Sequence, residues 1–169
     1  MANKAVFFDR DGTLNVDIHY LHRPEDFIWT EGAVAAIKYA NDHGYLTVVI
    51  TNQSGVARGY YGEEDILRMH AWMNDELKKN GAHLDAIYYC PHHIEGKIPK
   101  YTKKCNCRKP EPKMVNDACR DLDIDKMQSV FIGDTDGDMG CAKNAGIRGV
   151  RYTGGSLLDL LKKALENDK

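Results

Sequence analysis

The stretch that decides the fold is residues 4–13, KAVFFDRDGT, in which an apolar run passes directly into two aspartates and a glycine. The apolar run has the length and composition of a strand buried on both faces. Because side chains alternate along a strand, we expect Asp9 and Asp11 to project to the same side and Arg10 to turn away. Two carboxylates this close ionise together only beside a cation, or else one keeps its proton. The motif therefore predicts a magnesium or acid–base site at a strand end.

The rest of the chain alternates short apolar runs with longer segments of helical period. We expect strands over residues 4–8, 45–51, 86–90, 129–132 and 149–152. Apolar residues at helical spacing mark helices around 33–40, 66–77 and 115–122, and Ser156 can cap a last helix. Gly44 and Gly81 follow the first two helices and suit left-handed caps. This alternation is typical of an α/β fold, with a central parallel sheet between two layers of helices.

Composition limits the classes of partner. The chain has 169 residues, 43% of them hydrophobic, and a net charge of −2. We therefore expect one domain over residues 1–169. We also expect a monomer, although length and composition do not determine the oligomeric state. The charge offers no general attraction for nucleic acid or an anionic membrane, so the expected partner is a small molecule. No apolar run reaches about 18 residues, and the first apolar stretch is too short for a signal peptide, so we expect a cytoplasmic protein.

Polar residues follow other predicted strands as well. After the second strand comes a group that can hold phosphate oxygens: Thr51, Asn52, Gln53 and Ser54. After the fourth come Asp134 and Asp138, and Asp134 is the natural further ligand for Mg²⁺. Arg108 and Lys109 add positive charge before the third helix. Turn residues and helix caps are the alternative interpretation of each cluster taken alone. A calcium loop is excluded because the required Gly and Glu spacings are missing after Asp134.

Residues 91–112 form the one long irregular stretch, and three cysteines lie in or beside it. Cys90, Cys105 and Cys107, with His92 or His93, make the four ligands of a closed structural zinc site. Spacing alone leaves the choice of histidine open, and buried cysteines beside surface histidines are the alternative. A closed site has no position for a reactive water, so we expect the zinc to stabilise an inserted loop over residues 90–107. We expect Cys119 and Cys141, on helical segments, to be small core residues.

The strand-end groups together resemble the haloacid dehalogenase superfamily of phosphotransferases. The matching motifs are Asp-x-Asp-Gly-Thr at 9–13, Thr51, Lys109, and the acidic pair of Asp134 and Asp138. The resemblance implies a Rossmann-like fold of three layers and a Mg²⁺-dependent phosphatase. It implies that Asp9 forms an aspartyl-phosphate, that Asp11 acts as acid and base, and that Thr51 and Lys109 hold the phosphoryl group. Mg²⁺ would be held by Asp9, Asp134 and the backbone carbonyl of Asp11.

Within that superfamily, the zinc pattern and residues 51–59, TNQSGVARG, resemble the D-glycero-D-manno-heptose-1,7-bisphosphate 7-phosphatase family. This resemblance selects His92 as the zinc ligand, implies Arg108 as a recognition residue near a second phosphate, and places the chain in envelope polysaccharide synthesis. The implied substrate contacts are Asp17, Ile18, His19, Tyr20, Thr51, Asn52, Gln53, Ser54, Arg108, Lys109 and Thr135. Thr135 stands where the family pattern has lysine, and we expect Lys113 to supply that charge. The chain length implies no large cap domain, so short loops would select the substrate.

Three alternatives differ in chemistry. A histidinol-phosphate phosphatase would share the fold and a zinc loop but would act on a different phosphate ester. A non-catalytic phosphoacceptor module also uses an aspartate, Mg²⁺, threonine and lysine, but it has no use for an acid at Asp11. A zinc interaction module leaves the aspartates at the strand ends unexplained.

Overall fold

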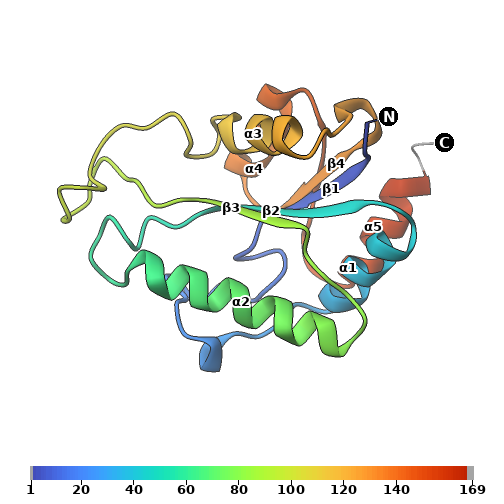
Figure 1. Cartoon of the computed structure of the whole chain (residues 1–169), viewed down its shortest axis with the longest axis horizontal. Coiled ribbons are helices and arrows are strands. Elements are labelled where there is room, and N and C mark those ends of the chain that lie inside the picture. Colours follow the sequence, from blue (N-terminus) through green and yellow to red (C-terminus); the bar gives the residue numbers. More distant parts are fainter. Residues whose placement is uncertain (1, 167–169) are drawn as a thin grey trace.

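The computed structural model describes residues 2–166, and its centre is a five-stranded parallel sheet (Figure 1). The strand order across the sheet is β3-β2-β1-β4-β5. The strands are β1 Ala5–Phe8, β2 Leu46–Asn52, β3 Ala86–Cys90, β4 Val130–Gly133 and β5 Arg148–Arg151. Each predicted strand is present, with ends that agree to within 1 residue. The predicted α/β class is confirmed.

Helices cover both faces of the sheet, which gives the predicted three layers (Figure 1). One face carries α1 Ala33–Asp42, α2 Glu63–Lys79 and α5 Leu157–Glu166, and the other carries α3 Lys113–Asp121 and α4 Asp136–Ala145. The alternation in β1 divides the core, because Val6 and Phe8 pack in the first layer while Ala5 and Phe7 pack in the second. All four residues are fully buried, so β1 lies at the centre of the molecule.

The helix ends follow the predicted signals. Gly44 has φ +79° and Gly81 has φ +73°, the left-handed conformation that glycine adopts without strain. Ser156 Oγ accepts a hydrogen bond from the Asp159 backbone N–H at 3.2 Å, as expected for a cap. Two short 3₁₀ helices, Pro24–Asp26 and Lys126–Gln128, were not predicted.

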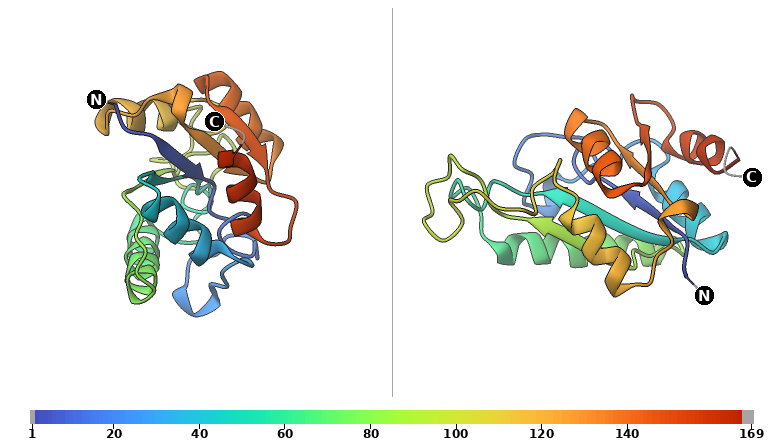
Figure 2. Two further views of the ribbon diagram at one scale, coloured as in Figure 1. Left: turned by 90° about the vertical axis from the view of Figure 1, so that its right-hand side faces the viewer. Right: turned by 90° about the horizontal axis from the view of Figure 1, so that it is seen from above.

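The strand order places the site. The chain runs outward from β1 to β3 and then returns to β4 on the other side of β1, so the order reverses between β1 and β4. Ligands of open parallel sheets bind at such a reversal, beyond the carboxyl ends of the strands. Residues 53–62 and 91–112 extend side by side from this end (Figures 1 and 2). The backbone N–H groups of Lys97 and Ile98 both donate to Ala57 O, at 2.7 and 2.9 Å.

The structure of residues 2–166 also bears on membrane spans and on the two cysteines expected in the core. No helix in this range has the length and hydrophobicity needed to cross a membrane. Cys141 is fully buried, as predicted for a core residue, whereas Cys119 is half-buried and packs against the same core.

Candidate active site

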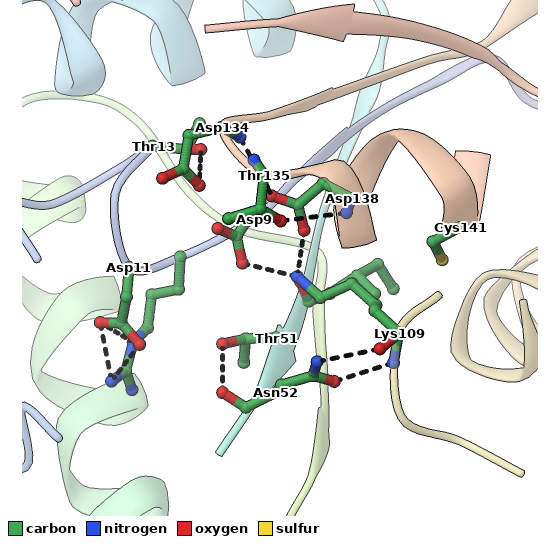
Figure 3. Close-up of polar contacts among 12 residues, drawn as sticks. Asp9, Asp11, Thr13, Thr51, Asn52, Lys109, Asp134, Thr135, Asp138 and Cys141 are labelled. Atoms are coloured by element: carbon green, nitrogen blue, oxygen red, sulfur yellow. Dashed lines mark hydrogen bonds and ion pairs between the residues drawn. The ribbon is translucent and has the colours of Figure 1, made fainter. Parts of the chain in front are cut away.

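Lys109 is the centre of the charged groups at this edge (Figure 3). Its Nζ donates to Asp9 Oδ1 and to Asp138 Oδ1, both at 2.6 Å, and to Ile50 O at 3.0 Å. Burial opposes the charge of this amine, but the facing carboxylates of Asp9 and Asp138 raise its pKa and keep it protonated. The side chains of all three ionisable residues are less than one-tenth exposed. The charged ammonium group of Lys109 is therefore fixed beside Asp9 in a water-poor environment.

Asn52, the last residue of β2, holds the backbone of Lys109 in place. Its Oδ1 accepts from Lys109 N at 3.0 Å, and its Nδ2 donates to Lys109 O at 3.4 Å. Lys109 belongs to the irregular stretch 91–112, so these bonds attach that stretch to the sheet. Thr51 is buried beside Asn52. Sequence reasoning placed Asn52 among the substrate contacts, and the structure adds this positioning of the lysine.

Asp9, Asp134 and Asp138 place carboxylate oxygens within 4.8 Å of one another, a donor set that suits a hard cation. Burial raises the pKa of both Asp9 and Asp134, and a cation between them would favour their charged forms. Gly12 makes room for this arrangement: a Cβ there would lie 2.2 Å from Asp134 Oδ2. Its φ of +91° also suits glycine. We call Asp9, Lys109, Asp134 and Asp138 the phosphate cradle.

The orientation of Asp11 differs from the prediction. Its carboxylate pairs with Arg10 Nη2 at 3.1 Å and accepts from Asn15 Nδ2 and Gln53 Nε2, both at 3.0 Å. Figure 3 shows it turned away from Asp9, and its carboxylate is not part of the acidic cluster. The expectation that Arg10 turns away is wrong, because β1 ends at Phe8 and the following residues form a turn without strand alternation.

Two adjoining cavities lie at this edge. The smaller, of about 160 Å³, is lined by Asp9, Asp11, Thr51, Asn52, Lys109, Thr135, Gly137 and Asp138. The larger, of about 310 Å³, is lined by Asp11, Asp17, His19, Tyr20, Asn52, Gln53, Ser54, Tyr61 and Arg108. Asp11 and Asn52 line both cavities. Nearly all of the sequence-predicted substrate contacts thus meet here, whereas Ile18 is half exposed and lines neither cavity.

The charge expected from Lys113 is not delivered to this edge. Lys113 begins α3, and its Nζ pairs with Asp117 Oδ2 at 2.6 Å, one turn further along the same helix. It lines neither cavity. Thr135 lines the smaller cavity, but its hydroxyl accepts from Asp138 N and caps α4. The lysine replaced by Thr135 therefore has no substitute in Lys113, because the i,i+4 pair on the helix surface holds that side chain.

A cysteine and histidine cluster lies at the base of residues 91–112, which we call the zinc loop. Donor atoms of Cys90, His92, Cys105 and Cys107 lie within 4.8 Å of one another. His92 Nδ1 is 3.3 Å from Cys107 Sγ and 3.6 Å from Cys90 Sγ, and Cys90 Sγ is 3.5 Å from Cys105 Sγ and 2.6 Å from Cys107 Sγ. His93 lies outside the cluster and accepts from Glu95 N at 3.0 Å. The donor set is compatible with Zn²⁺.

The zinc loop has a further attachment that sequence reasoning missed. The carboxylate of Glu63, at the start of α2, accepts the hydroxyl of Tyr89 at 2.7 Å and that of Tyr101 at 2.5 Å. These phenols lower the pKa of Glu63. Tyr89 is on β3 and Tyr101 is in the zinc loop, so one carboxylate joins a helix, a strand and the loop. No spacing in the sequence indicates such a contact.

Comparisons with known proteins agree with this geometry. A D-glycero-beta-D-manno-heptose-1,7-bisphosphate 7-phosphatase of Haemophilus ducreyi is 48% identical over 149 residues, 88% of this chain and 81% of the relative. The chain belongs to the heptose-1,7-bisphosphate 7-phosphatase family. A family model for HAD-hydrolase-like proteins matches residues 106–167.

Two more relatives extend the comparison within the phosphatase family. A D-glycero-alpha-D-manno-heptose-1,7-bisphosphate 7-phosphatase of Photorhabdus laumondii is 40% identical over 144 residues, 85% of this chain and 79% of the relative. The crystal structure of the D,D-heptose 1,7-bisphosphate phosphatase of B. bronchiseptica, complexed with magnesium and phosphate, matches with a TM-score of 0.81. It is 27% identical, and the match covers 97% of this chain and 99% of that one.

Proposed function

We propose that this chain hydrolyses the 7-phosphate of D-glycero-D-manno-heptose 1,7-bisphosphate and releases heptose 1-phosphate and inorganic phosphate. The observation that carries the proposal is the pair of adjoining cavities, which share Asp11 and Asn52. The smaller cavity, which Asp9 and Lys109 both line, suits a phosphoryl group, and the larger polar cavity suits the sugar. The names of the relatives supply the identity of that sugar.

Asp9 is the nucleophile in this proposal. One of its carboxylate oxygens bonds to phosphorus while the bond between phosphorus and the sugar oxygen breaks, which gives an aspartyl-phosphate. Lys109, 2.6 Å from Asp9, neutralises charge on the transferring oxygens, and Thr51 at the end of β2 holds them. A water molecule then attacks the phosphorus, and the bond to Asp9 breaks.

Asp11 moves the proton in both steps. It lines both cavities, so it lies where the phosphoryl group and the sugar meet. In the first step it gives its proton to the leaving sugar oxygen, which would otherwise depart as a strongly basic alkoxide. In the second step it takes a proton from the attacking water and returns to its starting form.

Two metals belong to the proposal. Asp9 and Asp134, with the backbone carbonyl of Asp11, would hold Mg²⁺, which when bound neutralises negative charge on the phosphate and on the carboxylates. The zinc loop cluster would hold a structural Zn²⁺. Its three cysteines are free thiols, which need a reducing compartment, so a cytoplasmic location is part of the same proposal.

Arg108 supports a substrate with two phosphates. It lines the larger cavity, and its Nη1 is buried without a hydrogen-bond partner among residues 2–166. The guanidinium of Arg108 offers an anion in this cavity a charged, planar set of donors. The 1-phosphate of the heptose provides that anion. Histidinol phosphate, the substrate of the rival phosphatase, has a single phosphate that the cradle already takes.

The test measures phosphate release, with and without Mg²⁺, from both anomers of heptose 1,7-bisphosphate and from histidinol phosphate. We expect Mg²⁺-dependent release of one phosphate from the bisphosphate, with a kcat/KM well above that for histidinol phosphate. The ratio between anomers gives the preference of this chain. Faster turnover of histidinol phosphate, or accumulation of phosphoprotein without release, would contradict the proposal.

A further inference from the structure

Gln53 links the two groups that the proposed function assigns to proton transfer and to phosphoryl binding. Its Nε2 donates to Asp11 Oδ2 at 3.0 Å and to Thr51 Oγ1 at 2.9 Å. An amide nitrogen carries two N–H groups, so these contacts use both of them. Gln53 is 2% exposed, and its carbonyl therefore needs a donor from within the protein.

Tyr61 supplies that donor. Its hydroxyl donates to Gln53 Oε1 at 2.6 Å, and the residue is 9% exposed. The ring can approach because residue 55 is glycine, where a Cβ would lie 2.1 Å from Tyr61 Cε1. Burial raises the pKa of Tyr61 further above neutral, so the phenol keeps the proton that it donates. Gln53, Gly55 and Tyr61 all lie in the loop after β2, and together they form this contact.

We propose that Tyr61 is a positioning residue for phosphoryl transfer: its hydroxyl holds the Gln53 carbonyl and thereby directs both amide N–H groups to Asp11 and Thr51. The proposal rests on the proposed function only in naming Asp11 as the proton donor. Without the hydroxyl, the buried carbonyl loses its donor, and the amide turns to find another. Asp11 and Thr51 then lose a shared partner.

Phosphate esters with different leaving groups can show whether Asp11 is misplaced. An alkyl leaving group departs with a proton from Asp11 as its bond to phosphorus breaks, whereas a nitrophenolate is stable enough to depart without one. The ratio kcat/KM reports events up to this first bond cleavage, and it is unaffected by later hydrolysis of the aspartyl-phosphate. A misplaced Asp11 therefore slows alkyl esters selectively, while general damage to the site slows alkyl and aryl esters together.

The experiment compares Tyr61→Phe with the unmodified protein, both with Mg²⁺, on 4-nitrobenzyl phosphate and 4-nitrophenyl phosphate. These esters have similar size and differ mainly in their leaving groups. We expect kcat/KM for the benzyl ester to fall about tenfold and that for the phenyl ester to stay within about twofold. Equal losses on both esters, or no loss on either, would overturn the proposal.

Two further variants test the route through Gln53. Tyr60→Phe is the matched control, because Tyr60 is half exposed and its ring packs on Tyr20, and we expect its ratio between the two esters to be unchanged. Gln53→Ala should show the selective loss on the benzyl ester, and adding Tyr61→Phe to it should change little more. Effects that simply multiply in the double variant would show that Tyr61 acts by another route.

A crystal structure of Tyr61→Phe gives a result that does not depend on turnover. We expect Gln53 Nε2 to leave its present positions near Asp11 and Thr51, and an unmoved amide would overturn the proposal. Failure of the proposed function gives a different result. A protein that ignores heptose bisphosphate but hydrolyses the nitro esters still tests Tyr61 through their ratio, and the crystal structure tests it even without turnover.

Discussion

The phosphate cradle and the zinc loop meet at Arg108 and Lys109, but different kinds of structure hold them. The cradle lies at the ends of β1 and β4, whose residues are completely buried or nearly so, and the hydrophobic core fixes it. The zinc loop has no helix or strand between 91 and 112. It is held by side chains at the cysteine cluster, Glu63 and Asn52, and by backbone hydrogen bonds to Ala57. Damage to the cradle should therefore stop the chemistry without unfolding the protein. Damage to the loop should change local order and reach the chemistry through Lys109.

The largest expected effect is that of Asp9→Asn, which removes the proposed nucleophile and should leave the fold intact. We expect kcat to fall by about 10⁴-fold or more. The melting temperature should not fall, because burial penalises the Asp9 charge and Lys109 keeps Asp138 and the carbonyl of Ile50. Single-turnover phosphate release and calorimetry measure the two quantities. Asp136→Asn, at an exposed position on the same edge, is the control and should retain activity. Residual activity above about one per cent in Asp9→Asn would exclude Asp9 as the nucleophile.

The variant Cys105→Ala tests how the cysteine cluster supports the zinc loop. We expect loss of bound zinc, proteolytic cleavage within 91–112, and a fall in kcat of roughly 10–100-fold as Lys109 loses its support. Metal analysis, limited proteolysis and steady-state kinetics measure these changes. Cys119→Ala is the control, since Cys119 lies on α3 outside the cluster, and it should keep its zinc. Full activity in a zinc-free protein would separate the loop from the chemistry.

The sequence predicted what regular periodicity and local motifs determine. The strands were placed to within 1 residue because buried parallel strands are short apolar runs, and Gly81 marked a helix end because its φ of +73° suits glycine. The aspartates, Lys109 and the cysteine cluster were predicted because each motif carries its own chemistry. The common edge of a parallel sheet then brings them together.

The remaining contacts depend on tertiary packing, which no local pattern encodes. Arg10 was expected to point away from Asp11, but the chain leaves strand geometry after Phe8 and the two side chains pair. Tyr61 and His70 carry polar groups, and both are nevertheless buried. His70 fills the helical spacing between Met69 and Met73 without revealing that Arg10 would contact it.

His70, whose ring contacts Arg10, gives the stability of the fold a dependence on pH. Burial, together with the nearby Arg10 charge, lowers its pKa from 6.5 to about 3, so it stays neutral in the folded protein. The unfolded chain binds a proton near pH 6.5, so the free energy of unfolding falls as the pH drops from 6.5 towards 3. Between pH 7 and pH 5 this residue should cost about 2 kcal/mol.

The variant His70→Gln tests this dependence, because the glutamine carbonyl can accept from Arg10 and does not titrate. Denaturant titrations at pH 7 and pH 5 should show a smaller acid loss for the variant than for the unmodified protein, by about 2 kcal/mol. His43→Gln, at an exposed position after α1, should leave the loss unchanged. Identical acid losses in His70→Gln and the unmodified protein would mean that His70 is protonated when folded.

The smallest expected effect isolates the attachment of the zinc loop at Glu63, through Glu63→Gln compared with Glu64→Gln. Both residues lie in the first turn of α2, so each change removes one favourable charge from the helix start. Only Glu63 accepts from Tyr89 and Tyr101, and its loss should cost about 1 kcal/mol more, or about 2–4 °C in melting temperature.

Because these phenols lower the Glu63 pKa, the difference should disappear as the pH falls through that lowered pKa and the unmodified carboxylate is protonated. Zinc content should stay the same in both variants, since the cysteine cluster holds the loop independently. Equal shifts in melting temperature would show that the helix charge, and not the contact between the loop and Glu63, accounts for the effect.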